Sequence, residues 1–163
     1  MKSIKINPKI LEKYFDMKVR EQCKSCKRFN TKNTCPNNIE SFDYFKNLLP
    51  TYKYGIIYYK LFEIDNLDNW INLGKNSSLE LHNFLLKERE NLLNRGIYFN
   101  VAFTGGSCKL CDKCSFPCIY PNKALIPLEA TGINIVKLMK QFGIKISFPV
   151  KTNFYRVGLL LWD

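Results

Sequence analysis

Apolar positions along the chain switch between helical and strand spacing. Helical spacing follows Asn7-Pro8, where an Asn cap precedes Pro at the first helical position. Two Asn or Ser residues with Glu three positions later have capping-box spacing, Asn37 with Glu40 and Ser77 with Glu80. The pattern predicts further helices over residues 37–50, 67–73 (ended by Gly74), 77–96 and 128–142, the last with Gly143 as C-cap. Runs of β-branched and aromatic residues predict strands over 54–62, 97–103, 146–150 (an edge strand) and 155–162.

These elements predict an α+β fold in which a three- to four-stranded sheet is covered by helices. The run 54–62 is apolar on both faces, which is typical of a central strand. No internal repeat, low-complexity tract or linker divides the sequence, so we interpret residues 1–163 as a single cysteine-rich metal-binding domain. The cysteines lie outside the main periodic segments and are expected in loops clustered at one end.

Composition favours a globular protein, since 46% of the 163 residues are hydrophobic and 14% aromatic. No run is as long and apolar as a membrane helix, and the polar start lacks a signal-peptide segment, so we expect a cytoplasmic protein without membrane contact. Thiols are reduced in the cytoplasm. Seven cysteines there indicate metal or redox chemistry more than a disulfide framework.

Four of the cysteines occupy eleven residues: Cys108, Cys111, Cys114 and Cys118, directly after Gly105-Gly106-Ser107. Their C-x2-C-x2-C-x3-C spacing is that of the bacterial ferredoxin run that binds a [4Fe–4S] cluster, although Pro does not follow the last Cys directly. So short a loop buries few side chains, and thiolates around a metal centre would hold it together. A structural zinc site is the alternative, and disulfides or free thiols are a third interpretation.

A second group, Cys23, Cys26 and Cys35, supplies three more thiols, one short of two complete four-ligand clusters. In one allocation the dense run holds a cluster and this trio holds another with an open iron. In a second, Cys118 joins the N-terminal trio as the fourth ligand of its cluster. The cluster held by Cys108, Cys111 and Cys114 then has the open iron. In a third, only the dense run binds a cluster, and the first trio is vestigial or binds zinc. An open iron would be a position for substrate, because a vacant metal site acts as a Lewis acid.

The formal charge is +11. Six basic residues lie in or beside the cysteine loops, where Asp112 is the one acidic residue. Positive charge near an anionic cluster raises its reduction potential, and it would also attract an acidic redox protein. The alternative is that these side chains simply point to water. The aromatic run over residues 52–59 has no accompanying RNA-binding signature, so nucleic acid is not the favoured partner. The cations are Lys24, Lys27, Arg28, Lys32, Lys109 and Lys113.

With both groups placed, the chain resembles the uncharacterised domain-of-unknown-function family number 2284, described as predicted metal-binding proteins. The matching segments are Cys23 through Cys35-Pro36, the cysteine run from Gly106, residues 117–121, and the stretch from Glu129 to Ile135. Members tend to have Asp where this chain has Asn134. The resemblance implies metal or iron–sulfur binding and supplies no reaction.

We therefore expect an iron–sulfur protein with one or two [4Fe–4S] clusters that transfers electrons to a cytoplasmic partner. The alternatives are an enzyme or accessory factor with a three-Cys cluster and an open iron, and a zinc-stapled basic module that binds nucleic acid. No nucleotide-binding glycine loop or Ser-His-Asp set supports hydrolase or kinase chemistry. His82 is interpreted as a surface or half-buried helix residue. Glu129 either supports a metal ligand or is catalytic; the alternative is an acid at a helix N-terminus, where its charge interacts favourably with the helix dipole.

Overall fold

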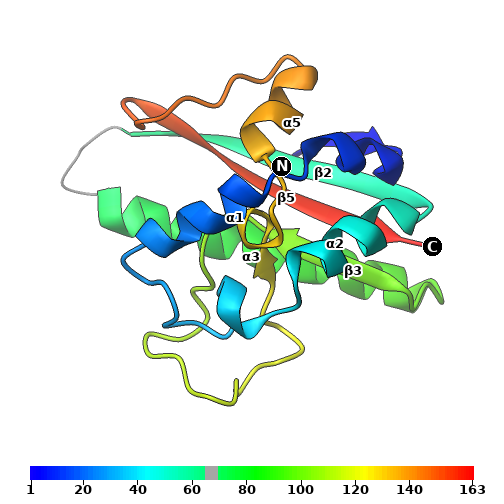
Figure 1. Ribbon diagram of the computed structural model, residues 1–163, viewed down its shortest axis with the longest axis horizontal. Helices are drawn as coiled ribbons and strands as arrows, with labels where there is room; N and C mark the ends of the chain where they lie inside the picture. The colour runs from blue at the N-terminus through cyan, green and yellow to red at the C-terminus, as the bar shows by residue number, and fades with distance from the viewer. Residues whose placement is uncertain (65–69) are drawn as a thin grey trace.

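The computed structural model describes residues 1–64 and 70–163, in which five strands form one sheet (Figure 1). Neighbouring strands run antiparallel except β3 and β4, which are parallel. In the order β1-β2-β5-β3-β4, the strands are Lys2–Ile6, Tyr54–Glu63, Asn153–Trp162, Asn100–Thr104 and Ile126–Pro127. The α-helices are α1 (Met17–Gln22), α2 (Phe42–Leu48), α3 (Trp70–Asn94), α4 (Leu128–Thr131) and α5 (Ile135–Gln141). The 3-10 helices are η1 (Pro8–Tyr14), η2 (Cys23–Ser25), η3 (Pro36–Asn38) and η4 (Leu49–Thr51).

Strands β2 and β5 are the long inner strands of the sheet. They pair along ten residues each, from Tyr54 opposite Trp162 to Glu63 opposite Asn153. Strand β2 also pairs with β1, so the predicted central strand is confirmed. The α+β class is confirmed as well. The sheet has five strands rather than three or four, because β1 carries two lysines in five residues and β4 is only two residues long, which hides both from pattern reading.

The two faces of the sheet bury different residues of the same strands. Alternate residues such as Ile57, Leu159 and Leu161 pack against η1, α2, α4 and α5. The intervening Tyr58 and Leu160 pack against α3. The period-2 alternation of side chains along a strand produces this arrangement, and Figure 1 shows α3 on one side of the long strands and the shorter helices on the other.

Helix α3 is one continuous helix of 25 residues where the pattern predicts two. Gly74 lies inside it, and Ser77 is buried instead of capping a new helix. The Ser77 hydroxyl donates to the Gly74 carbonyl at 3.3 Å and accepts from the Arg156 Nε at 3.0 Å. This contact with β5 replaces the predicted capping box. The first part of the predicted helix over 67–73 lies outside the described residues.

Other boundaries move for local reasons. The first helix begins as predicted, with the Asn7 side chain accepting from the Lys9 N–H, but it is a 3-10 helix. The capping box at Asn37 is wrong, since α2 begins after Ser41, whose hydroxyl accepts from the Tyr44 N–H. The segment 128–142 forms two helices because Gly132 adopts the left-handed conformation at φ 98°. Residues 146–150 form no strand.

The cysteines lie in two loops at one side of the sheet, in the lower part of Figure 1. One loop joins α1 to η3, and the other leaves the end of β3 and returns to β4. Gly105 starts the second loop in close contact with β5. A Cβ there would stand 2.7 Å from the Val157 carbonyl oxygen, so only glycine fits without displacing backbone.

Candidate metal centre

The first three cysteines are gathered by a series of tight turns. The Cys26 N–H donates to the Cys23 carbonyl at 3.0 Å, and the Cys35 N–H donates to the Lys32 carbonyl at 3.0 Å. Burial raises the pKa of the Cys23 thiol, and the nearby charges of Glu129, Cys26 and Cys35 raise it further. The three thiols therefore belong to one local environment, which we call the N-terminal trio.

The later run gathers a second set of three. Burial raises the pKa of the Cys108 thiol; the backbone N–H of Leu110 and the charge of Lys32 lower it, while Cys114 and Cys111 raise it. Cys108, Cys111 and Cys114 are thus neighbours, and we call them the loop trio. All seven thiols are free of disulfides.

Lys32 and Asn33 connect the two cysteine loops. The Lys32 ammonium donates to the Cys111 carbonyl at 3.2 Å. The Asn33 side-chain amide donates to the Cys114 Sγ at 3.1 Å and to the Ser115 carbonyl at 2.7 Å. Two consecutive residues of the first loop therefore direct N–H groups onto the loop trio.

Lys32 is buried, with 8% of its surface exposed. Within residues 1–64 and 70–163, no carboxylate lies within ion-pair distance of its ammonium. The Lys32 ammonium lines a cleft beside the loop trio, where its partial removal from water makes an opposite charge nearby favourable. The thiolates of the loop trio would supply that charge. The low exposure of Lys32 argues against the alternative in which this side chain simply points to water.

Arg20 approaches the N-terminal trio from α1. Its Nη2 donates to the carbonyls of Pro36 at 2.8 Å and Glu40 at 2.7 Å, and its charge favours the Cys23 thiolate. Its Nη1 is buried with no hydrogen-bond partner among the described residues, as are the hydroxyls of Thr34 and Thr104. A buried donor without an acceptor costs about 1–3 kcal/mol, and thiolate or sulfide sulfur would satisfy it.

A polar cluster at the start of the second loop contains Glu129, Gly106 and Arg156. The Gly106 N–H donates to the Glu129 carboxylate at 3.4 Å. Burial raises the pKa of the Glu129 carboxyl, while this N–H and the Arg156 charge act in the opposite direction. The Arg156 guanidinium lies over the Phe154 ring at 5.0 Å and donates from Nη2 to the Gly74 carbonyl at 2.8 Å. Glu129 thus lies near both Cys23 and the start of the second loop, not only at a helix N-terminus.

The donor set fits an anionic, sulfur-rich group in its chemistry: thiols in two trios, a buried ammonium, an amide aimed at sulfur, and buried donors without acceptors. In the part of the chain that the structure describes, no three His, Cys, Asp or Glu side chains are close enough to hold one metal ion. The assignment of all seven cysteines as ligands stays a prediction. A four-iron cluster places atoms between its ligands and so spaces the sulfurs more widely than one ion does.

Among the described residues, no hydrogen bond joins His82 to a cysteine of either trio. It is 2% exposed, more buried than predicted, and its Nε2 lies 2.6 Å from the Lys123 carbonyl oxygen. Asn134 caps α5, accepting from the Lys137 N–H at 3.0 Å.

Of the described helices, none has the length and apolar character needed to span a bilayer.

The family model described as predicted metal-binding protein, DUF2284, matches residues 7–162. The chain belongs to this family. The match spans both cysteine loops, and the family's description predicts metal binding for its members. No curated protein and no solved structure matches the chain.

Sequence reasoning missed Arg20, Asn33 and Arg156 as residues of this region. Asn33 carries a weak signal, since it lies between two cysteines of the first group. Arg156 has a stronger one: it is the only charged residue in the otherwise apolar run 154–162. A lone charge in a buried strand requires a partner, which the pattern could have indicated.

Proposed function

We propose that the protein is an iron–sulfur protein whose two trios, with Cys118 completing one of them, hold one or two [4Fe–4S] clusters. The observation that carries the proposal is the buried Lys32 and the Asn33 N–H on the Cys114 sulfur. Both groups favour negative charge on the loop trio, and a cluster ligated by thiolates is anionic. Neutral thiols would provide no opposite charge for the Lys32 ammonium.

A bound cluster would supply one-electron redox chemistry. The surrounding residues tune it: N–H groups that donate to sulfur and nearby cations stabilise the more negative, reduced state. Lys32 and Asn33 act in this direction on the loop trio. We infer that the protein carries electrons in the cytoplasm, and that its potential is higher than the same thiols would produce in neutral surroundings.

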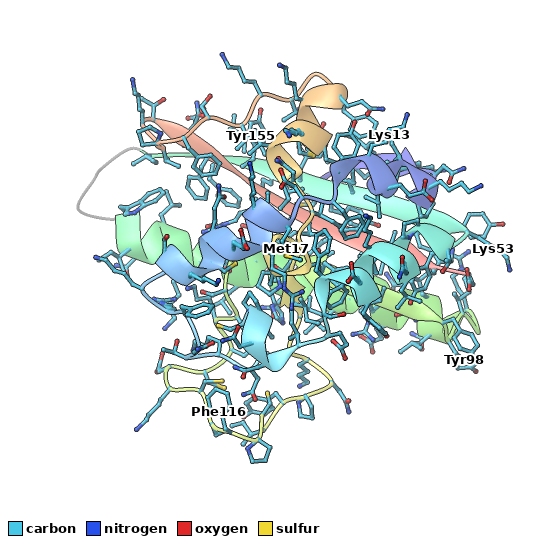
Figure 2. All side chains as sticks on the ribbon, in the orientation of Figure 1. Lys13, Met17, Lys53, Tyr98, Phe116 and Tyr155 are labelled. Carbon is cyan, nitrogen blue, oxygen red and sulfur yellow. The ribbon has the colours of Figure 1, made fainter. Side chains whose placement is uncertain are left out.

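The proposed partner is an acidic redox protein. Lys24, Lys27, Lys109 and Lys113 lie around the cysteine loops, and three exposed apolar residues, Phe116, Ile119 and Tyr120, lie beside them. Figure 2 shows Phe116 on the loop that projects from the body of the protein. Exposed apolar residues together with cations on the same loops fit a transient electron-transfer partner of opposite charge, whose association salt would weaken.

The test is purification without oxygen, followed by counts of iron, acid-labile sulfide and zinc per chain. We expect a brown protein with about four or about eight irons and equal sulfide. A colourless protein with stoichiometric zinc would refute the proposal and favour the zinc-stapled basic module. Electron paramagnetic resonance after dithionite reduction separates a cluster from adventitious iron.

A second candidate function is an enzyme or accessory factor in which one trio leaves an iron open to substrate. One feature favours it: Cys111 and Cys114 line a cleft that solvent can enter. A simple carrier needs no such opening. Addition of cyanide, a small ligand for iron, would alter the visible and paramagnetic spectra of an open-iron cluster and would leave those of a four-thiolate cluster unchanged.

A further inference from the structure

A cleft of about 790 Å³ lies between the two cysteine loops and the start of α3. Three segments line it, namely the loop that contains Arg28 and Lys32, the first turns of α3, and residues 106–116; Arg156 of β5 also contributes. Its volume falls within the range of about 300–1,000 Å³ that small-molecule sites occupy. The cleft is therefore large enough for an organic ligand beside the loop trio.

The charge of the lining greatly exceeds what a cluster would neutralise. Six cations face the cleft against one carboxylate, Asp112, which already pairs with the Lys75 ammonium at 3.1 Å. A [4Fe–4S] core carries about −1 in total with three thiolates and about −2 with four. Arg156 also has the buried Glu129 carboxyl nearby, but positive charge remains in excess, and it converges on one concave surface. The six are Arg28, Lys32, Lys75, Lys109, Lys113 and Arg156.

Two of these cations are held in place by the fold. Lys32 is buried and hydrogen-bonded to the second loop. Arg156 is fixed by the Gly74 carbonyl, the Ser77 hydroxyl and the Phe154 ring. Fixed charges bind an anion with little loss of side-chain entropy, unlike the mobile lysines of an ordinary surface.

The cleft also has apolar surface. Trp70 and Phe116 line it, and the Trp70 ring is packed edge-on against Phe154 at 5.2 Å between centroids. A bare inorganic anion would leave these rings without a contact. An organic anion would place its charged groups on the cations and its carbon skeleton against the rings.

We propose that this cleft binds a small organic anion with at least two negative charges, through phosphate or carboxylate groups, next to Cys111 and Cys114. The placement beside a cluster rests on the proposed function, whereas the charge and shape of the cleft do not. The ligand would be the substrate of the open-iron candidate, or an anion that adjusts the potential of a carrier.

The test is isothermal titration calorimetry on the protein purified without oxygen, at matched ionic strength. Pyrophosphate and ADP probe phosphate recognition, citrate probes carboxylate recognition, and adenosine is the uncharged control. We expect ADP or citrate to bind at one site per chain while adenosine does not. Tighter binding of ADP than of pyrophosphate would indicate that the rings contribute.

Two variants on the same helix locate the site. Lys75→Glu reverses a charge in the cleft, and Lys87→Glu makes the same change at an exposed position of α3 outside it. We expect Lys75→Glu to weaken binding of a divalent anion about tenfold, because the reversed charge lies within one Debye length of the ligand. Lys87→Glu is expected to have little effect.

The inference is overturned if neither ADP nor citrate binds at up to about 10 mM, or if both variants weaken binding equally. Iron and sulfide are counted on the same samples. Iron-loaded protein that binds no anion contradicts this inference alone. Iron-free protein that binds an anion at Lys75 contradicts the proposed function alone.

Discussion

Gly105→Ala tests whether the close contact between the second cysteine loop and β5 fixes the position of the loop. The added Cβ would lie 2.7 Å from the Val157 carbonyl oxygen, with the Val157 nitrogen at 3.5 Å. Ordinary carbon–oxygen contacts are about 3.3–3.6 Å. The Val157 oxygen belongs to the backbone and the new Cβ is bonded directly to the backbone at residue 105, so no side-chain rotation relieves the overlap. Either β5 or the start of the loop must move.

Forcing extra volume into a packed site costs about 1–3 kcal/mol. For a chain of this length, each kcal/mol changes the melting temperature by about 2–4 °C, so a cost of about 2 kcal/mol lowers it by about 4–8 °C. The displaced loop should also bind metal less well, because Cys108 lies only three residues after the substituted glycine. Circular dichroism on heating measures the first effect, and iron per chain measures the second.

Gly74→Ala is the matched control. The nearest atom to its new Cβ is the Arg156 Nη2 at 3.9 Å, an ordinary contact, and alanine stabilises a helix interior by about 1 kcal/mol relative to glycine. We expect it to melt at or above the wild-type temperature with full iron. The argument fails if Gly105→Ala melts with the wild type and keeps its iron.

Three further predictions concern charge and ligation. Burial lowers the pKa of His82 below its ordinary 6.5, so the unfolded state binds more protons than the folded state. The free energy of unfolding should therefore fall as pH drops below 6.5, by up to about 1.4 kcal/mol per pH unit. Urea unfolding at pH 7 and pH 5.5 should show this loss, and His82→Gln should reduce it. Replacing Lys109 and Lys113 by Glu should lower the midpoint potential by tens of millivolts in a redox titration, and an unchanged potential would contradict the cationic tuning. Cys114→Ser should lose more iron than Cys118→Ser, because the Cys114 sulfur accepts from the Asn33 amide at 3.1 Å and is held in place by it; equal losses would contradict a special role for that contact.

Sequence patterns identified the long strands and the helical segments because these depend on local periodicity. The apolar run of β2 and the Asn7-Pro8 start of η1 are readable without knowledge of the fold. The two cysteine groups are likewise local, since their spacing is visible in the chain itself. The family assignment depended on the same residues.

Contacts between distant segments escaped prediction because no periodicity records them. Gly74 and Ser77 remain helical because Arg156, some eighty residues later, uses their oxygens as acceptors. The left-handed Gly132 divides a segment whose apolar spacing is compatible with one helix.

By itself, the sequence determined that thiols are present in two groups and that a sheet with helices would carry them. Only the tertiary structure placed Lys32 and Asn33 against the loop trio and assembled six cations around one cleft. The physical reason is that electrostatic environment depends on distance in space, whereas a sequence records distance along the chain.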